Sequence, residues 1–252
     1  MPGCRAVVDD GETGYLCKVR DGDDLAHSMK AFLALTSKEM ASMGRAGRLK
    51  MSKSFDQSLL IHINRQQSFD KRIKKAMTYS VKTGGKRIRP FLIHTMGRYL
   101  VVPKRQLLDF SLAVECVHLH SLIHDDLPAM DNDDYRRGKL TVHKKFDEAT
   151  AVLAGDMFQV LSVKTLVESK YLSPNQKIKS IQMLSRANGL DGLIAGQSLD
   201  IYMKKNSTIK DIEKMYLLKT GALFNLCFSL LSNVKTLNSK KKEELKKISE
   251  TI

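Results

Sequence analysis

The sequence contains no tryptophan, only five prolines and few aromatic residues of any kind (6%). Proteins that recognise specific nucleic-acid sequences commonly place aromatic side chains among basic ones, and no such segment is found here. The cysteines are far apart and form no CxxC pair, which argues against a zinc knuckle or a disulfide frame and fits a reducing compartment. They are Cys4, Cys17, Cys116 and Cys227.

Long apolar segments are missing as well. No uninterrupted apolar run approaches the roughly 18 residues that a membrane span needs. The chain does not open with a signal peptide, because its first ten residues already include Arg5, Asp9 and Asp10. We therefore expect a cytoplasmic protein without a membrane span.

Positive charge is abundant, with a formal net charge of +15 at pH 7. Nearly all of this excess falls after residue 56. A basic domain can bind nucleic acid, an acidic membrane surface or phosphorylated small molecules. The missing aromatic and zinc-finger patterns leave nucleic acid with little support, and we expect no nucleic-acid partner. A lysine-rich composition that serves only as a solvated surface explains most of Lys235–Lys247 equally well.

The first 56 residues differ in character from the rest. Ala6–Val19 has short β-type runs around Asp-Gly and Thr-Gly turns, which predict a hairpin or a strand and loop. Asp21–Leu35 reads as a helix capped by Asp23 or Asp24, and a second short helix is expected over Ser37–Lys50. The apolar face of the first helix consists of Leu25, Met29, Phe32 and Leu33. Residues 1–56 are thus interpreted as a short α/β fragment.

This fragment resembles the C-terminal end of the second lobe of retaining, two-lobed, sugar-nucleotide-dependent glycosyltransferases. The likeness covers roughly Arg5–Asp56 and depends on "DDGETGYL" followed by "DDLAHSMKAFL". A fragment of this size cannot supply a nucleotide-binding lobe, and we therefore expect no glycosyltransferase activity. An inert fusion is the favoured interpretation of Met1–Asp56.

From residue 57 onward the pattern is helical. Apolar residues recur at spacings of three and four between Ile73 and Ile252, with few β-branched runs and short polar connections. Leu172–Gln176 and Asn238–Lys242 read as such connections, and Ser173 before Pro174 is typical of a helix start. Residues 57–252 are therefore predicted to form one all-α domain.

The strongest chemical signal is "HSLIHDDLPAMDNDDYRRG" (His120–Gly138), in which Asp125, Asp126 and Asp131 follow an apolar approach over Leu112–His124. Clustered carboxylates repel one another unless cations bind there, and magnesium prefers oxygen ligands that leave room for water and phosphate. An acidic, solvated loop is the alternative for the motif taken alone. A calcium EF-hand is excluded, because its required glycine and glutamate are out of register.

A second motif, "TGGKRIRPFL" (Thr83–Leu92), places two glycines before a helix that tolerates Pro90 in its first turn. Glycine permits close backbone approach, and the neighbouring Lys86, Arg87 and Arg89 make an anion site with the helix N-terminus. The motif also occurs in ordinary turns, and it lacks the spacing of a P-loop.

Together the two motifs resemble the first aspartate-rich motif and the homoallylic diphosphate site of trans-isoprenyl diphosphate synthases, with the bacterial farnesyl diphosphate synthases nearest. The likeness continues through "AVLAGDMFQ" (Ala151–Gln159), "GLIAGQSLD" (Gly192–Asp200) and "LKTGALF" (Leu218–Phe224). It implies the isoprenoid-synthase helical bundle around a central cavity, a homodimer, and Mg²⁺-dependent condensation of isopentenyl diphosphate with an allylic diphosphate such as dimethylallyl or geranyl diphosphate.

The resemblance also implies roles for individual residues. The positions that bind isopentenyl diphosphate correspond to Lys86, Arg89, His118 and Arg137. Magnesium ligands correspond to Asp125 and Asp131, with Asp126 beside them. Contacts to the allylic diphosphate correspond to Arg136, Lys219 and Thr220, and polar groups that line the reaction cavity correspond to Gln197 and Asp200.

Three histidines precede the aspartates. His120 and His124 lie four residues apart, a spacing compatible with zinc, although no third ligand is evident and a hydrogen-bonded role for His124 is favoured. In the family that this chain resembles, the bulk of the side chain at His120 limits product length. The residue usually found at this position in bacterial farnesyl enzymes is aromatic. The histidine here therefore leaves both a farnesyl and a geranylgeranyl product as alternatives.

The resemblance is expected to be incomplete at the C-terminal end. The family carries a second aspartate-rich motif, whereas no Asp-Asp pair follows Asp134 in this sequence. Leu245, Ile248 and Ile252 fall on one face of an expected helix that is still repeating at the last residue. We therefore expect an incomplete bundle, and a non-catalytic module that binds prenyl diphosphates is kept as the alternative to an enzyme.

Overall fold

The structure is a computed structural model that describes residues 8–18, 21–68 and 70–234. The chain divides into two compact units, Met1–Ser58 and Leu59–Ile252. The division lies inside a single long helix, α3 (Ser37–Arg65). The expected helix over Ser37–Lys50 is therefore longer than predicted and continues through Asp56.

The first unit contains α2 (Gly22–Leu33) and the beginning of α3. The side chain of Asp21 accepts a hydrogen bond from the backbone N–H of Asp24, so the helix cap is Asp21 and the predicted caps Asp23 and Asp24 are wrong. Residues 8–18 form a turn closed by one isolated bridge, Asp10 to Gly14, and no strand is found in this described stretch. The apolar face of α2 is exposed, so it forms no core of its own.

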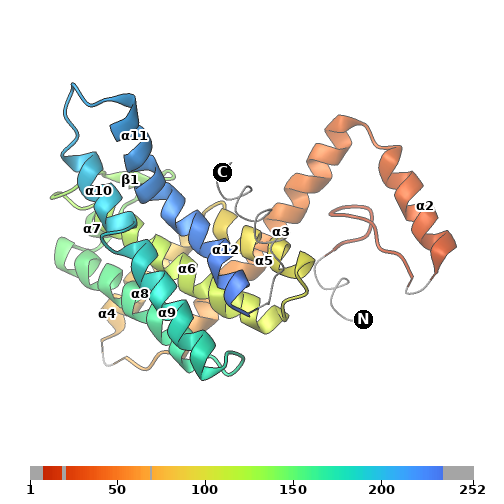
Figure 1. The fold of residues 1–252 in the computed structure, drawn as a ribbon, viewed down its shortest axis with the longest axis horizontal. Helices are drawn as coiled ribbons and strands as arrows, with labels where there is room; N and C mark the ends of the chain where they lie inside the picture. The colour runs from red at the N-terminus through yellow and green to blue at the C-terminus, as the bar shows by residue number, and fades with distance from the viewer. Residues whose placement is uncertain (1–7, 19–20, 69, 235–252) are drawn as a thin grey trace. The chain divides into compact units, whose positions relative to one another are not determined.

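The second unit is built from helices, as Figure 1 shows. Its elements after α3 are α4 (Lys71–Lys82), α5 (Ile88–Tyr99), α6 (Lys104–Asp125), β1 (Tyr135–Arg136), β2 (Lys139–Leu140), α7 (Val142–Lys145), α8 (Glu148–Glu168), α9 (Pro174–Asn188), α10 (Leu193–Ile201), α11 (Ile209–Tyr216), the π-helical segment η1 (Leu217–Gly221) and α12 (Ala222–Val234). The expected connection at Asn238–Lys242 and the helical face of Leu245, Ile248 and Ile252 lie outside the described residues.

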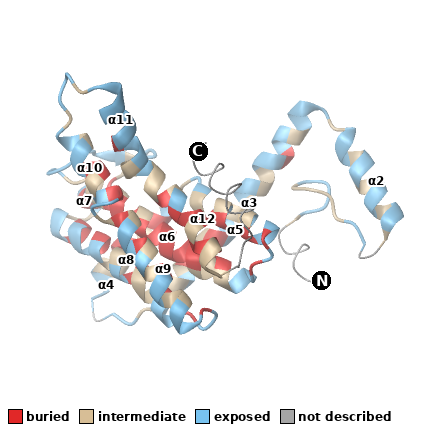
Figure 2. Cartoon of the chain, in the orientation of Figure 1, coloured by how far each residue is buried: buried red, intermediate tan, exposed pale blue. Residues whose placement is uncertain are grey.

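Two helices, α6 and α8, pack closely against each other at the centre of this unit. Both are buried on several faces, and most of the buried positions in Figure 2 fall on α6 and its neighbours. Gly155 of α8 allows the close approach, because a Cβ atom there would lie 2.2 Å from Nε2 of His124 on α6. A central helix is buried on more than one side, which explains why apolar residues predominate over Leu112–Ile123.

The apolar core continues from α6 to α5, α9 and α12. Phe110 and Val114 of α6 meet Leu223, Leu230 and Leu231 of α12 in one cluster of buried side chains. Gly97 of α5 lies against Leu107 of α6, where a Cβ atom would collide at 2.1 Å. The packing fixes the positions of α5 and α12, which carry basic and aromatic side chains of the site described below.

Local signals in the sequence explain several helix ends. Ser173 caps α9 in a reciprocal capping box with Gln176, and Pro174 occupies the first turn, as predicted. Pro90 lies in the first turn of α5, also as predicted. Thr208 and Asp211 form a second capping box at the start of α11. These caps satisfy backbone N–H groups that have no partner inside the helix.

Two helical stretches, Glu148–Glu168 and Ile209–Val234, are long and apolar enough to cross a membrane by length and composition alone. Core helices of globular proteins share this property. Half of the most apolar stretch of α8 is buried inside the fold, where it packs against α4, α6, α7 and α9. The apolar character of α8 therefore has an explanation in the core.

Candidate active site

The aspartate motif begins at the C-terminal end of α6. Asp125 is the last residue of that helix, and the chain then folds back so that the N–H of Asp131 donates to the carbonyl of Asp125 at 2.9 Å. The N–H of Asn132 donates to the carbonyl of Leu127 at 3.1 Å, and Asn132 itself has a positive φ of 53°. The loop thus brings Asp131 beside Asp125, as the spacing of the motif predicts.

Asp125 is in an environment that disfavours its charge. Burial raises its pKa from the ordinary 3.8 to about 6, the charge of Lys219 lowers it, and the neighbouring Asp131 raises it further. Unbalanced negative charge of this kind is relieved when a cation binds. The electrostatics around Asp125 therefore favour a cation beside Asp131.

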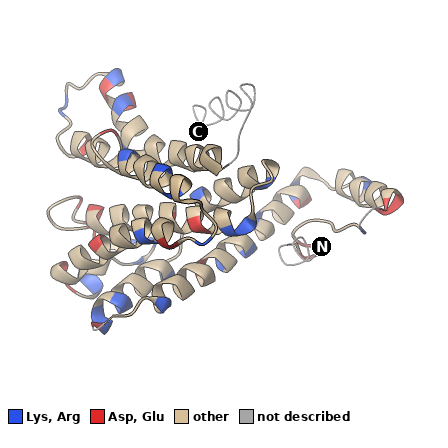
Figure 3. Ribbon diagram, turned by 60° about the horizontal axis from the view of Figure 1, so that its bottom comes forward, with Lys and Arg blue, Asp and Glu red and all other residues tan. Residues whose placement is uncertain are grey.

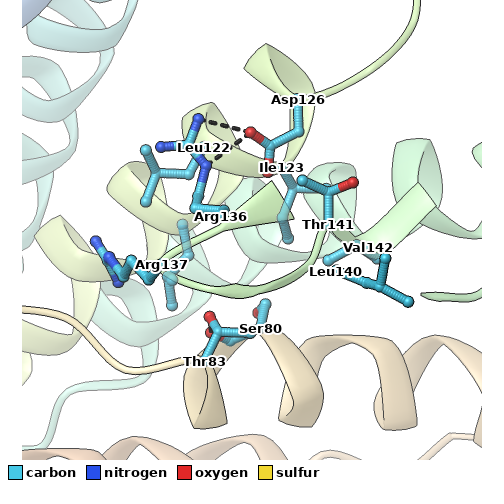
Figure 4. A pocket seen from close by; sticks show the side chains of 11 residues that line it. Ser80, Thr83, Leu122, Ile123, Asp126, Arg136, Arg137, Leu140, Thr141 and Val142 are labelled. Atoms are coloured by element: carbon cyan, nitrogen blue, oxygen red, sulfur yellow. Dashed lines mark hydrogen bonds and ion pairs between the residues drawn. The ribbon is translucent and has the colours of Figure 1, made fainter. Parts of the chain in front are cut away.

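Asp126 has a different neighbour. Its carboxylate is almost fully buried and accepts from Nε of Arg136 at 2.7 Å, and Nη2 of Arg136 lies 2.6 Å from the same oxygen. Figure 4 shows the two side chains in direct contact in the lining of a small pocket. Asp126 therefore holds Arg136 in this structure, and its role as a magnesium ligand stays a prediction.

The carboxylates can be tested against the needs of magnesium. Among the residues that the structure describes, no group of three His, Cys, Asp or Glu side chains is arranged to hold a metal ion. Magnesium needs fewer, because it keeps several waters and takes one or two carboxylates together with phosphate oxygens. Asp125 and Asp131 fit that requirement, whereas a zinc site at His120 and His124 finds no third ligand among the described residues.

A short hairpin that the sequence did not predict presents the next two arginines. β1 and β2 pair antiparallel, with Arg136 opposite Lys139, and Arg137 and Gly138 form the two-residue turn with φ values of 54° and 75°. Two positive φ angles match the twist of a hairpin, but they favour Asn-Gly over Arg-Gly, so the turn is not evident from composition. Nη1 of Arg137 donates to the carbonyl of Gly84.

This contact brings the hairpin to the glycine motif. Gly85 has no room for a side chain, since a Cβ atom would lie 2.6 Å from Nη1 of Arg137 and 2.9 Å from Nη1 of Arg87. Gly84 has a φ of 84°, which glycine adopts at little cost. Gly85 is therefore needed for the close approach of two guanidinium groups, as the motif suggests, and Gly84 is needed for the left-handed backbone before it.

The arginines of the glycine motif have different environments. Arg87 is buried and forms an ion pair with the buried Glu115 of α6 at 2.8 Å, and its Nη2 donates to the carbonyl of Val81. Arg89 lies in the first turn of α5 with its guanidinium over the ring of Phe224, 4.8 Å from the centroid. Nε of Arg89 is buried and has no hydrogen-bond partner among the described residues. Lys86 is exposed.

His118 lies where these arginines converge. Burial holds its pKa well below the ordinary 6.5, and the positive charges of four arginines lower it further. In decreasing order of effect they are Arg89, Arg137, Arg87 and Arg136. His118 is therefore neutral at pH 7, and the positive charge around it belongs to guanidinium groups, which bind phosphate oxygens well.

The opposite side of the aspartates is formed by α10 and η1. Lys219 of η1 forms an ion pair with Asp200 of α10, and its charge also acts on Asp125. A Cβ atom on Gly196 would lie 2.1 Å from the backbone nitrogen of Lys219, so the two elements touch backbone to backbone. Gln197 is buried, and neither of its amide atoms has a partner among the described residues. Thr220 is exposed.

His120 and His124 connect α6 to α8. Their rings stack edge to face with centroids 4.5 Å apart. Nδ1 of His120 lies 3.1 Å from the carbonyl of Gly155, and Nε2 of His124 lies 3.0 Å from the carbonyl of Val152. Burial and the neighbouring His124 lower the pKa of His120 to about 4. Both rings are therefore hydrogen-bonded, as expected for His124.

The sequence did not assign a role to three residues that shape this site. Glu115 pairs with Arg87, and Gly155 and Gly196 permit close packing. The glycines could have been noticed, because each interrupts an otherwise helical, apolar segment, which often marks close backbone approach. The pairing of Glu115 with Arg87 could not have been noticed, since the two residues are 28 positions apart and meet only after α5 packs on α6.

Comparison with known proteins shows the family. The polyprenyl synthetase family model matches residues 70–252. The chain belongs to this family of trans-prenyltransferases. Farnesyl diphosphate synthase of Micrococcus luteus is 39% identical over 210 residues, which cover 81% of this chain and 71% of that protein. Geranylgeranyl pyrophosphate synthase 3 of Arabidopsis thaliana is 40% identical over 157 residues, covering 60% of this chain and 44% of the relative.

Solved structures of the family have the same all-α fold. A geranyltransferase from Legionella pneumophila superposes with a TM-score of 0.76 at 36% identity, covering 81% of this chain and 74% of the other. The chain spans about half the length of several curated farnesyl diphosphate synthases, among them those of Haemophilus influenzae (54%) and Geobacillus stearothermophilus (52%). The activity, substrates and partners of those whole proteins are therefore proposals for this chain.

Proposed function

We propose that this polyprenyl synthetase condenses isopentenyl diphosphate with dimethylallyl or geranyl diphosphate in a Mg²⁺-dependent reaction that makes farnesyl diphosphate. One observation carries the proposal: in the hairpin, Arg136 donates to Asp126 of the aspartate motif at 2.7 Å, and the adjacent Arg137 donates to the carbonyl of Gly84 in the glycine motif. The arginines around His118 and the carboxylates around Asp125 therefore adjoin each other, and two diphosphates can bind side by side.

The two groups of side chains suit two different ligands. The cluster without a free carboxylate suits the diphosphate of isopentenyl diphosphate, and it consists of Lys86, Arg89, His118 and Arg137. The cluster with carboxylates suits a diphosphate that binds together with a cation, and it consists of Asp125, Asp131, Arg136, Lys219 and Thr220. Gln197 and Asp200 of α10 would line the reaction cavity.

Each group has a role in the proposed reaction. Magnesium, when bound by Asp125 and Asp131, would withdraw charge from the allylic diphosphate. Arg136 and Lys219 add preorganised positive charge to the same leaving group, which favours breakage of the carbon–oxygen bond. Arg89 and Arg137 orient isopentenyl diphosphate so that its double bond attacks the allylic carbon, after which a proton leaves the new product. Neutral His118 can donate a hydrogen bond without repelling the arginines.

The residue that we expect to determine product length is His120. Its ring is buried on α6, one and a half helical turns before Asp125, and contacts α8 through Gly155. We propose that the ring limits the growth of the prenyl chain at the farnesyl length. A geranylgeranyl product is the alternative, because histidine replaces the aromatic residue of bacterial farnesyl enzymes.

We further propose that the protein is a cytoplasmic homodimer. The free thiols of Cys116 and Cys227 are buried and fit a reducing compartment. A groove along α8 is lined by Val160, Val163 and Val167 together with Asp156, Gln159, Lys164 and Glu168. Charges of both signs around an apolar stripe suit a two-fold contact with a second copy. Sedimentation equilibrium that finds only monomer at micromolar concentration would refute the dimer.

The residues of the first unit are given no part in this reaction. We propose that Met1–Asp56 is a glycosyltransferase-like fragment without transferase activity. Binding of sugar nucleotides by the chain, measured by calorimetry, would contradict this assignment.

The test of the proposed function is product analysis. The full chain is incubated with isopentenyl and geranyl diphosphates over a range of magnesium concentrations, and prenyl products are identified by mass spectrometry. A farnesyl product that disappears when magnesium is chelated is the expected result. If calorimetry detects binding of isopentenyl diphosphate but no product forms at any magnesium concentration, the chain is the non-catalytic binding module instead.

A further inference from the structure

Arg89 needs a support that fixes its guanidinium, because its surroundings lack a hydrogen-bonding anchor. Nε of Arg89 is buried without a partner among the described residues, and burial lowers its pKa. A buried N–H group without a hydrogen-bond partner is costly unless a ligand or another group compensates it. This makes Arg89 a side chain that the fold holds ready for an anion.

The nearest carboxylate does not hold Arg89 in place. Glu115 attracts Arg89 electrostatically, but its Oε1 accepts from Nη1 of Arg87 at 2.8 Å. Arg87 is fixed by a second hydrogen bond, from Nη2 to the carbonyl of Val81 at 3.0 Å. Glu115 is thereby paired with Arg87, to which the family resemblance assigns no role.

The guanidinium of Arg89 lies over an aromatic ring. The guanidinium carbon lies 4.8 Å from the centroid of Phe224, within the range of a cation–π interaction. Phe224 is half-buried in the first turn of α12, where Leu223 and Leu226 on either side are packed in the core. A cation–π contact does not require the N–H groups to donate hydrogen bonds, so they stay available for oxygen atoms.

We propose that Phe224 is a positioning residue for isopentenyl diphosphate, acting through Arg89. The inference rests on the proposed function and deepens it, because it assigns to α12 a role in the site of the homoallylic substrate. The ring of Phe224 holds the guanidinium of Arg89 in place, because Glu115 is occupied by Arg87. The N–H groups of Arg89 are therefore already oriented when the diphosphate binds.

The test compares two substitutions at this position by isothermal titration with isopentenyl diphosphate alone, so that no turnover is needed. In Phe224→Leu, which keeps an apolar side chain and removes the ring, Kd is expected to rise about 2- to 30-fold. Phe224→Tyr keeps the ring and should bind within about twofold of the natural chain. Phe224→Met replaces the leucine variant if that protein does not fold, as judged by circular dichroism.

A matched control lies one helical turn further along α12. Phe228 is buried in the apolar core, so Phe228→Leu should lower the melting temperature without changing Kd for isopentenyl diphosphate. In steady-state assays Phe224→Leu should raise KM for isopentenyl diphosphate, leaving KM for geranyl diphosphate and kcat nearly unchanged. A purely structural role would move the two KM values together.

The outcomes separate this inference from the proposed function. If the natural chain binds isopentenyl diphosphate and Phe224→Leu binds it equally well, the inference is overturned and the proposed function stands. Equal losses in Phe224→Leu and Phe224→Tyr would also overturn it, since the ring would then be irrelevant. If the natural chain itself binds no isopentenyl diphosphate, the proposed function fails and the inference fails with it.

Discussion

Burial shifts the pKa values of His118 and Asp125 in opposite directions, and both shifts favour the neutral form. For His118 the neighbouring arginines add to the shift, so the base carries no charge where phosphate would bind. For Asp125 the effect is that a nearby cation stabilises the charged form of the carboxylate. At the scale of single residues the site therefore has two parts. The part around His118 suits an anion, and the part around Asp125 suits a cation together with the anion that the cation binds.

Replacement of Asp125 tests the cation part. We expect Asp125→Ala to lower turnover about 100- to 1000-fold, because a preorganised charged group at the reacting centre is removed. Asp9→Ala is the control, since Asp9 pairs with Lys50 in the first unit at 2.5 Å. Initial rates of farnesyl diphosphate formation measure both. Equal effects of the two substitutions would refute the site assignment.

His120 predicts a dependence of stability on pH. Its pKa is about 4 in the folded chain and near 6.5 when unfolded, so the unfolded chain binds more protons between these values. The free energy of unfolding should therefore fall as pH falls through this window, with His120 contributing roughly 2 kcal/mol between about pH 7 and about pH 5.

The matched variant for this effect is His120→Phe, which keeps a ring and removes the titrating group. Urea unfolding at the two pH values should show a smaller loss of stability than in the natural chain. His94, whose pKa burial also lowers to about 4, keeps part of the dependence in both proteins. An unchanged pH dependence in His120→Phe would show that His120 does not titrate as described.

At the scale of elements, the contact between α10 and η1 places Lys219. Gly196→Ala puts a Cβ atom 2.1 Å from the backbone nitrogen of Lys219, which a side-chain rotation cannot relieve. We expect a loss of about 1–3 kcal/mol in stability and a higher KM for geranyl diphosphate. Gly44→Ala is the control. Its Cβ would meet nothing within 4 Å, so it should stabilise α3 by about 0.5–1 kcal/mol.

Urea unfolding and steady-state kinetics measure the two glycine variants. If Gly196→Ala matches the natural chain in both, the backbone contact between α10 and η1 does not position Lys219. The π-helical form of η1 fits such a role, because π-helical turns often occur at functional sites.

The helices could be predicted largely from local signals. Capping residues such as Ser173 and Thr208, and Pro90 in a first turn, act within one helical turn and can be read from the sequence. The extension of α3 past Lys50 was missed although Phe55, Leu59 and Ile63 recur at a spacing of four and are all buried. The hairpin was missed because its turn requires Arg137 in a left-handed conformation, which local composition does not favour.

The site was predictable only in part. The aspartates and the glycine motif are short and could be recognised with their expected chemistry. That Asp126 binds Arg136, and that Glu115 is taken by Arg87 rather than Arg89, depends on the packing of α5, α6 and the hairpin. Such partners lie far apart in sequence, so single-sequence reasoning lists the charged residues without telling which of them are already paired.

At the scale of the whole molecule, the positive charge is spread over most helices of the second unit (Figure 3). Its convergence around His118 is local, since the guanidinium groups come from α5, the loop before it and the hairpin. The packing of these elements therefore gathers four guanidinium groups around His118.

The central claim is that the arginines near His118 and the carboxylates near Asp125 form one site for two diphosphates. A crystal structure of the chain with magnesium, isopentenyl diphosphate and an unreactive thio analogue of geranyl diphosphate tests it most directly. We predict isopentenyl diphosphate against Arg89, His118 and Arg137, and the analogue beside Asp125, Asp131 and Lys219. Diphosphate groups bound at separate places, with no shared cavity, would contradict the account.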